Sequence, residues 1–245
     1  FCAFMGLLWY CVGIIHIPVA SYFPLLRYIS TLSSRIAMDP SLLLKPADIW
    51  SSAWPSLRLW YFTVLENTPF PVPPPGAPDD WKVMVDSSVY GWGYFAVNMR
   101  TGEARQHGAP WAAFGTKFMS DFGHRLREST FAEPRGLLYS ALHLLPRNAP
   151  ARVEFWTDST VTKYAATKGY STRSYDLNHA IMRLRECFPA TEGFFFNFRH
   201  VPGVWNIIAD GLSRGKVFSA ENPALRAQML EILSSEALSG DNMEF

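Results

Sequence analysis

The sequence predicts a mixed α/β fold, a five-stranded sheet flanked by helices, with a small helical region before it. A proline-rich segment, TPFPVPPPGAPDD, divides the chain at residues 68–80. Prolines at this density favour an extended linker that neither a helix nor a central strand continues. Apolar residues recur at helical spacing before it, whereas short apolar runs of strand length alternate with helical patterns after it. The predicted order β, β, β, α, β, α, α, β, α specifies a mixed sheet with helices on its faces.

Residues 1–67 are predicted to form the small helical region. Ser52 and Pro55 mark the start of a helix, and Leu57, Trp60 and Val64 follow at helical spacing.

The first 26 residues are apolar and contain no Asp, Glu, Lys or Arg, and a stretch of this length can span a bilayer. Pro18 and Pro24 interrupt such a helix, and no basic segment or Met precedes it. We therefore expect buried core helices and no membrane span, with a membrane-anchored protein as the less favoured alternative. The missing Met indicates that the chain is part of a longer protein.

Residues 81–216 are predicted to hold the sheet. The runs KVMVDSS and GWGYFAVNM indicate two strands joined by a glycine-containing turn, and FFFNFRH alternates strictly, as a strand with two different faces does. The predicted elements are strands at 82–88, 91–99, within 102–111, 151–159 and 194–200, and helices at 133–145, up to 169, at 174–188 and from 206. Residues 217–245 are predicted to be a C-terminal helical tail.

Composition leaves several functions open and excludes others. The formal net charge of +1 at pH 7 means that a nucleic-acid partner would have to be bound by local clusters of Arg and Lys. Cys2, Cys11 and Cys187 are odd in number and show no CxxC spacing, which argues against a disulfide framework and a zinc site. We expect an intracellular protein, cytoplasmic or nuclear.

Four acidic residues lie where predicted strands end or helices begin: Asp86, Glu133, Asp158 and Asp210. Such positions can bring side chains from separate segments together. Asp86 follows Val83, Met84 and Val85 inside a predicted central strand, so its carboxylate needs a partner. The others also have ordinary explanations: Asp158 as a helix N-cap, Glu133 as a first-turn acid and Asp210 as a solvated surface residue.

If the four carboxylates converge, their mutual repulsion requires a cation. Oxygen ligands without Cys or His select Mg²⁺, with Mn²⁺ as a substitute. Two such ions ~4 Å apart support hydrolysis at phosphorus, so the chemistry predicted here is phosphodiester hydrolysis.

The motifs around these acids resemble the ribonuclease H domains of retroelement reverse transcriptases. HVPGVWNIIADGLSR, residues 200–214, is similar to the family's final strand, loop and helix, with Asn206 and Asp210 at the positions of its Asn and Asp. FWTDST, VMVDSSVYGWG and ESTFAEPRGLLYSAL resemble the second aspartate motif, the first aspartate motif and the helix with the catalytic glutamate, all in the family's order.

This resemblance implies that Asp86, Glu133, Asp158 and Asp210 are the catalytic residues and hold two Mg²⁺ ions. The implied activity is cleavage of the RNA strand of an RNA/DNA hybrid, with the polymerase portion of the same element as a partner. The run GYSTRSYDLNHAIMRLRECF together with HVPG is most similar to DIRS-like or VIPER-like elements, and gypsy-type elements follow. FMGLLWY and YFPLLRYIS are weakly similar to the thumb and connection of such polymerases.

Two departures from the family leave alternatives open. Pro134 directly follows the implied catalytic glutamate, so Glu128 is an alternative for it. His200 precedes the loop in which cellular and retroviral members carry a histidine, and its parity with Phe196 and Phe198 predicts a core-facing structural residue. The alternative is an auxiliary role in product release.

Substrate contacts are expected from Ser87, Ser88, Asn206 and Arg173. The two serines lie beside Asp86, and the 2′-hydroxyl that they would contact distinguishes RNA from DNA. Arg173 belongs to a basic cluster with Lys163, Lys168, Arg183 and Arg185, which could follow phosphates or form an ordinary solvated face. The alternative function is a catalytically inactive ribonuclease H-like domain that serves as a structural tether.

Overall fold

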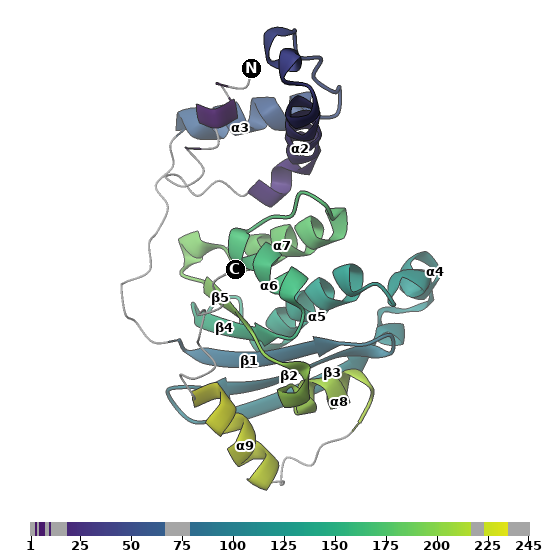
Figure 1. Ribbon diagram of the computed structural model, residues 1–245. Coiled ribbons are helices and arrows are strands. Elements are labelled where there is room, and N and C mark those ends of the chain that lie inside the picture. Colours follow the sequence, from purple (N-terminus) through teal and green to yellow (C-terminus); the bar gives the residue numbers. More distant parts are fainter. Residues whose placement is uncertain are drawn as a thin grey trace.

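The sheet has the predicted five strands. The computed structural model of the chain describes residues 3, 5–7, 10, 19–66, 79–216 and 223–234. The strands lie in the order β3-β2-β1-β4-β5, with β2 antiparallel to β1 and β3 and with β4 parallel to β1 and β5 (Figure 1). Their bounds are β1 Trp81–Ser87, β2 Gly91–Asn98, β3 Ala104–Pro110, β4 Arg152–Thr157 and β5 Phe195–His200. The mixed sheet confirms the predicted fold class.

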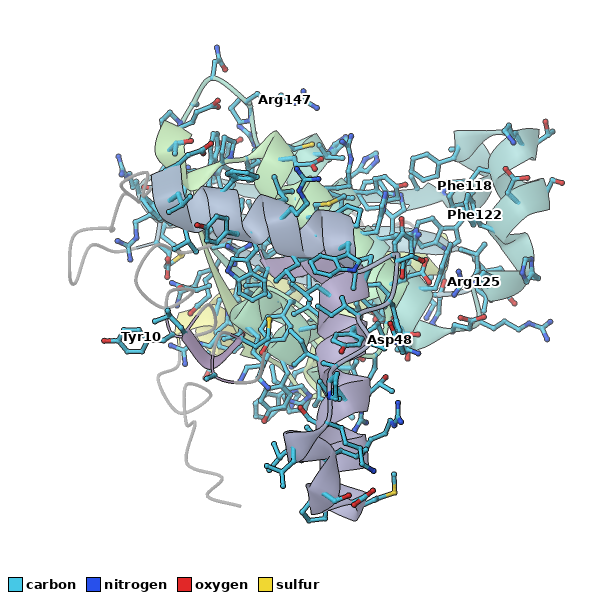
Figure 2. All side chains as sticks on the ribbon, turned by 90° about the horizontal axis from the view of Figure 1, so that it is seen from above. Tyr10, Asp48, Phe118, Phe122, Arg125 and Arg147 are labelled. Carbon is cyan, nitrogen blue, oxygen red and sulfur yellow. The ribbon has the colours of Figure 1, made fainter. Side chains whose placement is uncertain are left out.

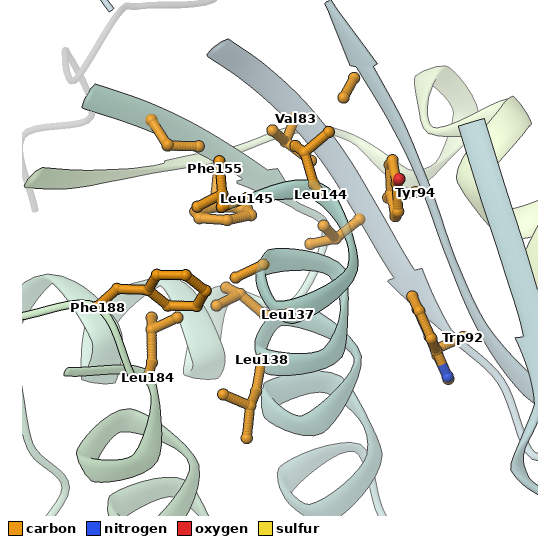
Figure 3. Close-up of a cluster of buried hydrophobic side chains, with 14 of the residues drawn as sticks. Val83, Trp92, Tyr94, Leu137, Leu138, Leu144, Leu145, Phe155, Leu184 and Phe188 are labelled. Atoms are coloured by element: carbon orange, nitrogen blue, oxygen red, sulfur yellow. The ribbon is translucent and has the colours of Figure 1, made fainter. Parts of the chain in front are cut away.

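Helices cover both faces of the sheet (Figure 1). One face carries α5 (Ser129–Leu144), α6 (Thr160–Lys168) and α7 (Tyr175–Cys187), and the other carries α8 (Ile207–Ser213) and α9 (Pro223–Ser234). The central strands are therefore apolar on both sides. The core under α5 and α7 joins Val83 and Phe155 of the strands to Leu137, Leu144 and Leu184 of the helices (Figure 3).

The helix with Glu133 begins one turn earlier than predicted. The expected start was Glu133, whereas α5 begins at Ser129 and contains Pro134 in its interior. Pro134 cannot donate a main-chain hydrogen bond to the Thr130 carbonyl, and its side chain is buried in the helix. The consequence is that Glu133 lies in the second turn of the helix and not at its exposed start.

Strand β5 shows the predicted alternation in part. Phe196 and Phe198 pack against the core under α5 and α7, and Asn197 is exposed. The prediction that His200 faces this core is wrong: the residue ends the strand, where it pairs with Thr157 of β4, and it is exposed.

The described part of the N-terminal region is helical, as predicted, with α2 (Phe23–Met38) and α3 (Trp54–Glu66). Tyr22, Leu25 and Trp60 are buried between these helices. Ala20 packs on Leu177 of α7, which joins the region to the sheet. Among the described residues no helix is long and apolar enough to cross a membrane. Residues 67–78, 217–222 and 235–245 lie outside the described residues, and the division into domains stays a prediction.

A segment between β3 and α5 was not predicted as helical. It contains α4 (Thr116–Phe122), whose Phe118 and Phe122 lie side by side, and Arg125 follows them (Figure 2). Arg125 donates to Oδ2 of Asp176 at 2.7 Å, and Arg135 of α5 donates to Oδ1 at 3.1 Å. The mostly buried carboxylate at the start of α7 therefore fixes both the new segment and the first turns of α5.

Replacing this carboxylate tests how much it stabilises the fold. Asp176→Ala is expected to lower the free energy of unfolding by roughly 2 to 3 kcal/mol, because the side chain of Arg135 is only 11% exposed and loses its ionic partner. Urea denaturation measures the change. The control Asp121→Asn removes an exposed pair with Lys117 and should cost less than about 1 kcal/mol. Equal losses in the two variants would contradict the assigned role of Asp176.

Candidate metal-binding site

Three of the four predicted acids come together at one end of the sheet. Met84 of β1 lies opposite Trp156 of the parallel strand β4, so Asp86 and Asp158, each two residues further on, reach the same edge. Glu133 approaches them from α5. One carboxylate oxygen from each of Asp86, Glu133 and Asp158 lies within 4.8 Å of the other two.

Local structure leaves these carboxylates available. The N-cap of α6 is Ser159, whose side chain accepts a hydrogen bond from the Thr162 N–H, so the reading of Asp158 as the N-cap is wrong. The reading of Glu133 as a first-turn acid is also wrong, because the helix begins at Ser129. Glu128, the alternative to Glu133, is half-exposed and pairs with Arg125 at 3.0 Å.

The close approach of α5 to β1 depends on Gly136. A Cβ atom at this position would lie 1.9 Å from the Ser87 hydroxyl oxygen, which would have to turn away, and 3.3 and 3.4 Å from the Ser87 Cβ atom and the Asp86 carbonyl oxygen. Gly136 lies almost one helical turn after Glu133, so the absence of a side chain there brings Glu133 within reach of Asp86.

Burial disfavours the charged form of each acid in the trio. Burial, together with the charges of Asp86 and Asp158, raises the pKa of Glu133 to about 9. Burial also raises the pKa of Asp86 to about 6, against the opposing hydrogen bond from Ser213. The pKa of Asp158 is raised mainly by burial, whereas its own backbone and His200 lower it. The three groups cannot all ionise without a compensating cation.

The oxygen atoms of the trio suit a hard divalent ion. Glu133 Oε2 is buried and has no hydrogen-bond partner among the described residues, which is unusual for a buried polar atom. Carboxylates without sulfur or nitrogen ligands are the donors that Mg²⁺ and Mn²⁺ prefer. The donor set therefore fits the metal class expected from the sequence.

Asp210 lies next to the trio but outside it. Its Oδ1 accepts a hydrogen bond from Arg214 Nε at 2.8 Å, and its side chain is 38% exposed. Its charge still acts on the pKa values of Asp86 and Asp158. Because Arg214 contacts Oδ1, a fourth ligand role for Asp210 would fall to its other carboxylate oxygen, Oδ2.

Two buried residues of α8 and its preceding loop hold the site in place. The Asn206 amide donates to the Val85 carbonyl at 2.8 Å. The Ser213 hydroxyl lies 2.6 Å from Asp86 Oδ2 and 2.8 Å from the main-chain oxygen of Asp210, and donates its one proton to either. Sequence reasoning missed Ser213, although it lies one turn after Asp210 in the ADGLSR segment.

The four residues expected to contact substrate differ in how far they are buried. Asn206 and Ser88 are buried, and the Ser88 hydroxyl donates to the Ser213 carbonyl at 2.7 Å. Ser87 is partly buried beside Asp86, and Arg173 is exposed in the loop before α7. No contact joins Arg173 to the trio in the part of the chain that the structure describes. Substrate contact by any of the four stays a prediction.

Comparison with known proteins finds a likeness to ribonucleases H. No protein-family model and no curated protein match the chain. The chain is similar to the structure of RNase H1 from the halophilic archaeon Halobacterium salinarum NRC-1, with 19% identity and a TM-score of 0.34. The match covers 54% of this chain and 91% of the archaeal one. The chain is also similar to the N-terminal RNase H domain of Rv2228c from Mycobacterium tuberculosis (16% identity, TM-score 0.38), with 56% and 99% covered. Likenesses of this size do not establish an activity, so the carboxylate geometry and the sequence motifs have to support it.

The raised pKa values predict how stability depends on pH. An acid whose pKa is raised on folding stabilises the folded protein fully when the pH is below its pKa in the unfolded protein. This stabilisation is lost as the pH rises towards its pKa in the folded protein. For Glu133 that window runs from the ordinary value of 4.5 to about 9. In EDTA, the free energy of unfolding should therefore fall with rising pH across this window, and Glu133→Gln should recover on the order of 1 to 3 kcal/mol at its upper end.

Chemical denaturation at several pH values, with and without Mg²⁺, measures this dependence. Glu128→Gln on the same helix is the matched control and should keep the slope of the unaltered protein. Mg²⁺ should stabilise the unaltered protein more at high pH than at low pH, because ion binding competes with protons. Asp86 contributes to the slope below about pH 6, so a slope above about pH 6 that survives Glu133→Gln would show that Glu133 is not the group responsible.

Proposed function

We propose that this chain contains a ribonuclease H domain that cleaves the RNA strand of RNA/DNA hybrids with Mg²⁺, and that it belongs to a retroelement reverse transcriptase. The observation that carries the nuclease assignment is the convergence of Asp86, Glu133 and Asp158, whose oxygens lie within 4.8 Å of one another. Asp86 is buried and Glu133 and Asp158 are partly buried, so bringing these three acids together from separate segments has a desolvation cost.

The trio is proposed to hold the divalent ions, and Asp210 is proposed to join it. Bound Mg²⁺ supplies activation of a water and stabilisation of the leaving oxygen at phosphorus. The residues of the chain orient this chemistry: Ser213 and Asn206 fix Asp86 and the end of β1, and Ser159 caps α6 so that Asp158 stays available. His200, exposed at the end of β5 and close enough to act on the pKa of Asp158, is the auxiliary residue for product release.

The hybrid substrate and the retroelement context are supported by the four motifs in family order. The HVPGVWNIIADGLSR segment supplies the loop and α8, which pack against β1 and β2 and bring Asp210 beside the trio. In this proposal the polymerase portion of the same element is the natural partner, since it would produce the hybrid that the domain cuts.

Cleavage of a labelled hybrid tests the proposal. The full chain with Mg²⁺ should cut the RNA strand and leave the DNA strand intact. Asp86→Asn and Asp158→Asn should each reduce the rate of cleavage at least about a hundredfold, because the carboxylates are proposed to bind the ions jointly and the loss of one ligand weakens the whole site. Asp121→Asn, which changes an exposed acid on α4, should cut at the rate of the unaltered protein.

Mn²⁺ titration followed by electron paramagnetic resonance separates the alternatives. Binding that is lost in Asp86→Asn supports a working metal site. A protein that folds but binds no Mn²⁺ at these carboxylates and cuts no hybrid would be the inactive structural domain, and the nuclease proposal would be wrong.

A further inference from the structure

A groove lies between edge strand β3 and the end of α8, on the sheet face opposite α5. Its volume is about 450 Å³. The lining comes from Gln106–Pro110 of β3, from Tyr90 in the turn between β1 and β2, and from Leu212–Lys216. We call it the β3 groove. Gly108 lets β3 pack close against the end of α8, because a Cβ atom there would lie 2.7 Å from the Leu212 carbonyl oxygen.

The β3 groove shares a wall with the carboxylate site. Ser213 lines the groove, and its hydroxyl is 2.6 Å from Asp86 Oδ2. Arg214 also lines it, and its Nε donates to Asp210 at 2.8 Å. A strand with one phosphate at the carboxylates therefore has the groove directly beside it.

The two sides of the groove are held together. The Ser88 hydroxyl, in the turn that carries Tyr90, donates to the Ser213 carbonyl at 2.7 Å. The Tyr90 N–H donates to the same Ser88 oxygen at 3.1 Å, and the Tyr90 carbonyl accepts from the Trp111 N–H at 3.0 Å. The backbone of Tyr90 is thereby fixed, and its side chain is 66% exposed, so the ring is open to contact by a ligand.

The lining of the groove has the chemistry of a nucleotide site. Arg214 and Lys216 are exposed cations, and none of the described residues that line the groove is acidic. Cations beside an exposed aromatic ring bind single-stranded nucleic acid, the cations through phosphates and the ring through stacking on a base. The groove has the volume of a small-ligand pocket, the size of site that holds a base and its phosphate.

We propose that the β3 groove binds the unpaired continuation of the nucleic-acid strand that is cut at the carboxylates, with a base on Tyr90 and phosphates at Arg214 and Lys216. This inference rests on the proposed function. It adds a substrate preference to that function: a hybrid with a single-stranded extension of its RNA strand binds more tightly than a blunt hybrid.

Fluorescence anisotropy with the full chain in EDTA tests this preference without cleavage. The probes are a labelled blunt RNA/DNA hybrid and two hybrids whose RNA strand extends by about six nucleotides at the 5′ or the 3′ end. At least one extended hybrid should bind roughly fivefold to twentyfold more tightly than the blunt one. Tyr90→Leu should abolish this gain, Tyr90→Phe should keep it, and Lys216→Gln should reduce both the gain and its dependence on salt.

Matched controls lie on the other side of the sheet and on α4. Tyr175→Leu changes another exposed tyrosine, which packs on Phe23 of α2, and Lys117→Gln changes another exposed lysine. Both should keep the full gain. The proposal is overturned if neither extension tightens binding, or if the gain survives Tyr90→Leu.

Cleavage of the blunt hybrid with Mg²⁺ on the same preparation separates this proposal from the one on which it rests. Cleavage without any gain from an extension overturns the groove assignment alone. If the protein neither cleaves nor binds the hybrid, both proposals are overturned. Concentration-dependent self-association with no gain would assign the edge of β3 to pairing with a second copy, and would also overturn the groove assignment.

Discussion

The carboxylate of Asp86 lies in a strand that is covered by helices on both faces, and it has two further carboxylates within 4.8 Å. Desolvation and mutual repulsion both disfavour this arrangement, since each acid raises the proton affinity of the next. A fold retains such a cluster only if its other interactions hold the acids in place. The remainder of the domain can be understood as the framework that keeps these groups together despite their repulsion.

That framework draws on distant parts of the chain. The parallel pairing of β1 with β4 brings Asp86 and Asp158 to one edge, and Gly136 lets α5 come close enough for Glu133. On the opposite face, α8 contributes Ser213 and its loop contributes Asn206, so that the site is supported from both layers of helices. The stability lost at the acids is therefore offset by packing elsewhere, as is common at functional sites.

Strong periodicity and motif order were enough to predict the sheet, the order of its elements and the acids that meet. Alternation in FFFNFRH and the apolar run before Asp86 are local signals of strands, so the strands were found with small errors at their ends. The sequence could not show that Ser159, rather than Asp158, caps α6, because both residues are good caps and only geometry separates them. Exposure of His200 and the contact of the Ser213 hydroxyl with Asp86 depend on contacts across the fold, which no local pattern contains. The α4 segment was missed because its apolar residues, Phe118 and Phe122, pack against the edge of the core and give no long stripe.

The central claim is that the trio of acids binds divalent cations. Anomalous diffraction from crystals of the full chain soaked in Mn²⁺ tests it most directly, because the ion is located without reference to activity. The account predicts a strong anomalous peak in contact with Asp86, Glu133 and Asp158, and its loss in crystals of Asp86→Asn. A well-ordered structure at saturating Mn²⁺ with no peak between these three side chains would contradict it.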